Sequence, residues 1–130
     1  MHSWIKRLER EAGKDMVVLK LRDGGVRAFS DQEVFTEMFL TQTDLLMGEA
    51  RSSEVLDAVR AATPESRAAF EDEYGSIEMV AHIVAPDYQG GWVEENRLLE
   101  DGTAETIHYE GGSEEAERIR QEATQRGPAF

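Results

Sequence analysis

The chain has 130 residues, of which 40% are hydrophobic and 32% charged, and its formal net charge is −13. This length and composition predict one acidic globular domain over residues 1–125, with residues 126–130 as a disordered end. The absence of cysteine excludes disulfides, thiolate nucleophiles and zinc sites built from sulfur. No stretch is apolar enough to span a membrane, so we expect a soluble cytoplasmic protein that makes no membrane contact.

The charge is distributed unevenly along the chain. Residues 1–30 hold seven bases and four acids, whereas residues 31–130 hold seven bases and 23 acids. Direct nucleic-acid binding is disfavoured, because neutralising phosphates requires a concentrated basic surface. The uneven charge is explained most simply by a solvated surface that keeps a small protein soluble. The alternative is an acidic surface for a basic protein partner, since complementary fields speed encounter and suppress wrong partners.

The first 29 residues predict a short helix followed by a β-hairpin. Ser3 can cap a helix whose apolar positions keep three-and-four spacing, and Gly13 can end it. From Met16 the apolar residues alternate, and Asp23-Gly24 is a strong signal for a two-residue turn. This turn would place Leu21 opposite Val26 in the return strand.

A long central helix is expected to begin at Ser30, which forms a capping box with Glu33. At 100° per residue, six large apolar side chains fall within an arc of about 140°. They are Val34, Phe35, Met38, Phe39, Leu45 and Leu46. We predict that this arc forms the core, so that truncating Phe35 or Phe39 would be among the most damaging substitutions.

The same helix carries a second, narrower apolar seam at Leu40 and Met47, which lie outside the main arc. A chain of this size has few other helices and strands with which to cover both sides of one helix. A second copy could cover the seam, and twofold symmetry would let the same residues serve both partners. The sequence therefore predicts a homodimer with Leu40 and Met47 as its interaction residues.

The rest of the chain predicts further helices and a second hairpin. Helices are expected over residues 53–62, from Thr63-Pro64 to Gly75, and from Ser113 to about residue 125. The apolar run over residues 77–84 fits either a buried strand or a buried helix, and we favour the helix. Residues 92–110 read as a hairpin around Asp101-Gly102, in which Glu95 would face His108.

The best enzyme-like set comprises Glu73, Glu78, His82 and Asp87. On a helix, Glu78 and His82 would share one face, and carboxylate and imidazole ligands suit zinc, manganese or iron. A third ligand is missing, and an ordinary surface ion pair explains the spacing better. We therefore predict no catalytic residue, no metal and no cofactor, with Glu78 and His82 as the only candidates for a metal site.

Two stretches resemble parts of short, uncharacterised bacterial proteins. The first is Ser-Trp-Ile-Lys-Arg-Leu-Glu near the start, and the second is Val-Leu-Lys-Leu-Arg-Asp-Gly-Gly-Val-Arg-Ala-Phe. The resemblance covers about the first third of the chain. It contains no functional motif and implies no activity.

Taken together, the patterns predict an α+β fold in which two β-hairpins form an antiparallel sheet and the middle helical region packs on one face. Because isolated hairpins are marginal in water, we favour one joined four-stranded sheet or firm helix support for each hairpin, with two separate hairpins as the alternative. The function favoured is a noncatalytic protein-protein interaction or regulatory module. The alternatives are a small metal-assisted enzyme using Glu78 and His82, and an acidic decoy of nucleic acid that binds a basic protein site.

Overall fold

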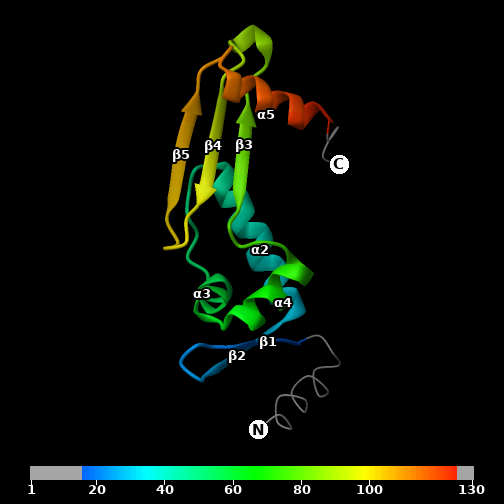
Figure 1. The fold of residues 1–130 in the computed structure, drawn as a ribbon, viewed down its shortest axis with the longest axis vertical. Coiled ribbons are helices and arrows are strands. Elements are labelled where there is room, and N and C mark those ends of the chain that lie inside the picture. Colours follow the sequence, from blue (N-terminus) through cyan, green and yellow to red (C-terminus); the bar gives the residue numbers. More distant parts are fainter. Residues whose placement is uncertain (1–15, 126–130) are drawn as a thin grey trace.

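A computed structural model describes residues 16–125 of the chain, in an α+β arrangement of two antiparallel sheets with helices between them (Figure 1). The helix predicted after Ser3 and the predicted disordered end lie outside the described residues. The strands are β1 (Met16–Lys20), β2 (Val26–Ser30), β3 (Val80–Val84), β4 (Val93–Leu98) and β5 (Ala104–Tyr109). The helices are α2 (Asp31–Leu46), α3 (Glu54–Ala61), α4 (Pro64–Tyr74), the short 3-10 helix η1 (Asp87–Gln89) and α5 (Glu114–Gln125).

The predicted α+β class is confirmed, but the two hairpins do not join into one sheet. β1 and β2 form a two-stranded sheet, while β3 adds to the second hairpin in the order β3-β4-β5. The helices α2, α3 and α4 separate the two sheets (Figure 1). The small sheet is supported at its side by a bridge between Leu21 and Ala62 and by the buried side chains Leu19 and Phe29. This support stabilises the first hairpin, which would be only marginally stable alone.

Both hairpins form, but each is shifted by one residue from the predicted register. Three residues, rather than two, connect the strands in each case. In the first hairpin, Gly24 N–H donates to Leu21 O at 3.0 Å, and Leu21 N–H donates to Gly25 O at 2.8 Å. Gly24 has a φ of 91°, so it occupies the positive-φ position of a three-residue loop. The Asp23 carboxylate accepts from Gly25 N–H at 2.7 Å and stabilises this loop.

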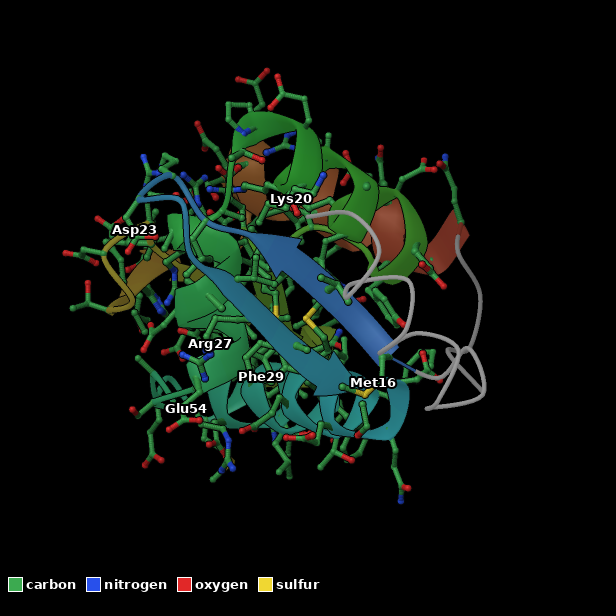
Figure 2. The ribbon with its side chains drawn as sticks, turned by 90° about the horizontal axis from the view of Figure 1, so that it is seen from below. Met16, Lys20, Asp23, Arg27, Phe29 and Glu54 are labelled. Carbon is green, nitrogen blue, oxygen red and sulfur yellow. The ribbon has the colours of Figure 1, made fainter. Side chains whose placement is uncertain are left out.

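The shift changes which side chains face each other. Leu19 pairs with Arg27, whose guanidinium lies 5.1 Å from the centre of the Phe29 ring and 3.5 Å from the Glu54 carboxylate (Figure 2). The second hairpin repeats the same turn, with Gly102 at a φ of 89°. As a result Glu94, not Glu95, faces His108.

The central helix α2 begins as predicted, but only one side of its predicted apolar arc is buried. The capping box between Ser30 and Glu33 is present in both directions. The residues that become buried are Val34, Thr41 and Leu45, with Met38 half-buried between them. Phe35 and Phe39 are instead 58% and 67% exposed, so the prediction that they form the core is wrong. The side of the arc with Val34, Met38 and Leu45 packs on the core, whereas the side with Phe35, Phe39 and Leu46 stays exposed.

Three other helices follow their predicted signals. Ser53 caps α3, Thr63 caps α4 with Pro64 in its first turn, and the Ser113 hydroxyl accepts from Ala116 N–H at 3.2 Å at the start of α5. The favoured helix over residues 77–84 is wrong, because Val80–Val84 forms strand β3. The run is short and rich in valine and isoleucine, and pairing with β4 decides its conformation. Within residues 16–125, no helix combines the length and apolarity needed to cross a membrane.

Truncation of α2 side chains tests which face forms the core. Leu45 is fully buried, and we expect Leu45→Ala to lower the free energy of unfolding by about 3 kcal/mol. Phe39→Ala should cost less than about 1 kcal/mol, because the ring is already largely in water. Chemical denaturation of both variants measures the difference. A larger loss for Phe39→Ala than for Leu45→Ala would contradict the assignment of faces.

Candidate interaction surface

The outward side of α2 is exposed along its whole length and carries no charge. It contains four large apolar side chains, of which Phe39 is 67% and Met47 75% exposed. Polar but uncharged residues fill the positions between them. The complete set, called here the charge-free face, is Gln32, Phe35, Thr36, Phe39, Gln42, Thr43, Leu46 and Met47. An uncharged apolar surface of this kind is unusual in a chain with a net charge of −13.

The charges of α2 lie in two bands between the buried stripe and the charge-free face, where each meets a local partner. Asp31 accepts from the Tyr74 hydroxyl, and the Glu33 carboxylate accepts from the Ser30 backbone N–H at 3.2 Å. Burial and the hydrogen bond to Asp31 raise the pKa of Tyr74. Further along, the Arg51 guanidinium lies 3.0 Å from the Glu37 carboxylate and 4.0 Å from that of Asp44.

The carboxylates on the rim of the charge-free face outnumber Arg51, the base that pairs with two of them. Helix α2 contains four acids and no base. At its N-terminal end, the Phe35 ring meets the Tyr74 ring edge-on, with 5.3 Å between the ring centres. This contact continues the surface onto the end of α4, where Asp72 and Glu73 are exposed. The charge-free face is thus an apolar strip bordered by carboxylates.

The two interaction residues predicted from the sequence lie along one border of this face. Met47 belongs to it, whereas Leu40 is half-buried beside it. Sequence reasoning missed Phe35, Phe39 and Leu46, because it assigned them to the core. The signal that could have revealed them is the width of the apolar surface of α2, which covers more of the helix circumference than one buried stripe requires.

The predicted enzyme-like set does not come together. Since β3 is a strand, Glu78 and His82 do not share a helix face, and Glu78 lies 3.7 Å from the guanidinium of Arg67. Asp87 pairs with Arg120 at the start of η1, and Glu73 is on α4. The residue that meets His82 is Glu95, its partner across β3 and β4. His82 therefore bonds to Glu95 and not to Glu73, Glu78 or Asp87.

The His82–Glu95 pair forms a small polar cluster on the three-stranded sheet. His82 Nε2 lies 2.8 Å from one oxygen of Glu95, and Arg97 donates to the other. Glu95 is only 5% exposed. Burial would raise the pKa of this carboxyl, but the hydrogen bonds from His82 and Arg97 outweigh burial and lower it. The cluster satisfies a buried carboxylate, and it places no nucleophile beside the histidine.

Neither a metal site nor a relative indicates a function. In the part of the chain that the structure describes, no three or more His, Asp or Glu side chains are grouped so that they could hold a metal ion. Comparison with protein-family models, curated proteins and solved structures gives no significant match. Function is therefore inferred from the exposed surface, where local packing does not explain the charge-free face of α2.

The Glu95 cluster predicts a pH dependence of stability. We expect Glu95→Gln to lower the free energy of unfolding at about pH 7 by about 2 kcal/mol, because it weakens two charge-assisted hydrogen bonds. The folded-state pKa lies below the unfolded value of about 4.3. The contribution is therefore present above that pH and is lost as the pH falls through the folded-state pKa. Denaturant titrations of both proteins at several pH values should show the difference shrinking in acid, and a constant difference would contradict this role.

The absence of a third ligand predicts that the purified protein binds no stoichiometric transition metal. Elemental analysis after dialysis measures the metal content directly. His82→Ala should leave that content unchanged, as should the matched substitution His108→Ala on β5. A bound metal that His82→Ala removes and His108→Ala retains would contradict the prediction.

Proposed function

We propose that this protein is a noncatalytic interaction module that binds an amphipathic, basic segment of a partner protein through the charge-free face of α2. The observation that carries the proposal is the run of exposed, uncharged residues along one side of α2, from Gln32 to Met47. Aromatic residues and methionine are enriched at protein interfaces, and charged residues are depleted from interface cores. Phe35, Phe39 and Met47 fit that composition.

The charge around the face specifies the chemistry of the partner. Acids border the apolar strip, and α2 itself supplies no base. A helix whose apolar stripe is flanked by lysine or arginine would bury its stripe on Phe39 and place its cations beside the acidic rim. A second copy of this chain fits less well here, because the acidic rims of two copies would face each other.

The proposal is tested with a model helical peptide of leucine and lysine in which the leucines keep helical spacing. Fluorescence anisotropy at moderate salt measures its affinity for the full chain. We expect Phe39→Gln and Met47→Gln each to weaken binding by about tenfold, as expected for exposed anchor residues. Tyr88→Gln is the matched control, because Tyr88 is also an exposed aromatic residue but lies on η1.

Two control peptides separate this proposal from attraction by charge alone. One has the same composition in scrambled order, and the other replaces lysine by glutamate. We expect the scrambled peptide to bind at least about tenfold more weakly and the acidic peptide not to bind. Equal binding of the ordered and scrambled peptides, or binding that is unchanged by Phe39→Gln and Met47→Gln, would contradict the proposal.

A further inference from the structure

Strand β3 is the edge of the three-stranded sheet, and its outer backbone groups have no partner among residues 16–125. Leu98 N–H donates to Met79 O, and Ala85 N–H donates to Trp92 O, both at 2.9 Å. In an antiparallel ladder alternate residues point toward the neighbouring strand. The residues of β3 whose N–H and C=O groups point away from β4 are therefore Val80, His82 and Val84. Among residues 16–125, none forms a hydrogen bond with these outward backbone groups.

This edge lacks the features that normally protect an edge strand. Proteins place lysine, proline or a bulge on exposed edges, because unpaired backbone groups recruit other strands. Strand β3 reads Val-Ala-His-Ile-Val and has no acid, lysine, arginine or proline. Its exposed side chains are apolar, with Val80 48% and Val84 37% exposed. The opposite edge, β5, carries the charged and exposed Glu105.

We infer that two copies of this chain pair through β3, antiparallel about a twofold axis beside His82, and so form one continuous six-stranded sheet. The strand sequence is nearly symmetric about His82. Twofold pairing places Val80 of each copy opposite Val84 of the other, and His82 opposite its own equivalent. All the outward N–H and C=O groups of Val80, His82 and Val84 then find partners.

Charge favours a second copy as the occupant of this edge. Two chains that each carry −13 repel, so a contact between them must keep acids away from its centre. Strand β3 meets this condition, because none of its residues is acidic. The Glu95 carboxylate, which contacts His82 of β3, is also bound by Arg97 and is buried.

The surroundings of Val84 also have room for the Val80 side chain that twofold pairing would bring from the second copy. Helix α5 crosses the sheet beside the upper end of β3 and continues past it (Figure 1). A groove of about 600 Å³ lies between them, lined by Val84, Ala85, Pro86 and the α5 residues Gln121, Ala123 and Thr124, among others. Val80 of the second copy would lie beside Val84, at this groove. Apolar contact there adds to the backbone hydrogen bonds.

The inferred dimer is weak, because a five-residue strand and one groove from each copy bury less than the area of about 1,200 Å² that marks stable interfaces. Sedimentation velocity of the full chain should therefore show association between low micromolar and near-millimolar protein. We expect Val80→Lys to weaken it by at least about tenfold, because two lysines enter the contact. Tyr88→Lys makes the same change of charge at an exposed residue outside the strand and should not weaken it.

Amide hydrogen exchange gives a local measurement. As protein concentration rises, the amides of Val80, His82 and Val84 should become protected in the parent chain and stay unprotected in Val80→Lys. Val84→Pro removes one outward donor without changing charge and should also weaken association. Circular dichroism checks whether each variant is folded. If Val80→Lys or Val84→Pro does not fold, the other of the two is used for the test.

Each alternative outcome overturns the inference. A parent chain that stays monomeric at every concentration would show that β3 does not pair with a second copy. A dimer that tolerates both β3 substitutions would place the contact elsewhere. A dimer lost on Leu40→Glu or Met47→Glu, but retained in Val80→Lys, would place the contact on α2. Failure of peptide binding at the charge-free face would leave this inference unaffected, since the two surfaces share no residue.

Discussion

The packing of one narrow stripe of α2 against strands of both sheets is the contact on which the rest of the structure depends. Val34 and Leu45, near opposite ends of that stripe, are both fully buried, and both belong to the main core. The two-stranded sheet lacks the area to be stable by itself. It shares its core residues Leu19 and Phe29 with the helices that also support the three-stranded sheet. One helix therefore joins two small sheets that do not touch edge to edge.

Burying that stripe has a consequence for the opposite side of α2. The helix is apolar over more of its circumference than one contact can cover, and the described chain leaves the second apolar strip in water. Acids are numerous in this chain, but none lies in this strip. Glutamine and threonine occupy the positions between the apolar residues instead. A face that is neither buried nor charged is explained more readily by a binding role than by folding.

The three-stranded sheet shows a related contrast between its two edges. β5 carries a charged residue on its exposed surface, whereas β3 is uncharged apart from a histidine that bonds to Glu95. Helices support the sheet at different ends: α5 packs its buried Ala116 and Ile119 on Val93, while Ala81 and Leu98 join the core around α2. Neither set of contacts pairs the outer backbone of β3. An open edge and an open helix face can thus serve separate contacts.

The sequence by itself determined the features that depend on neighbouring residues. Ser30, Ser53 and Thr63 cap helices because each side chain reaches a backbone donor three residues on, and the two Asp-Gly pairs form turns because glycine accepts positive φ. Tertiary structure alone decided the rest. Which stripe of α2 is buried depends on where the sheets lie, and β3 is a strand because β4 offers it partners. The candidate surface at Phe39 could not be read from the sequence, since an apolar side chain has the same periodicity whether it faces a core or water.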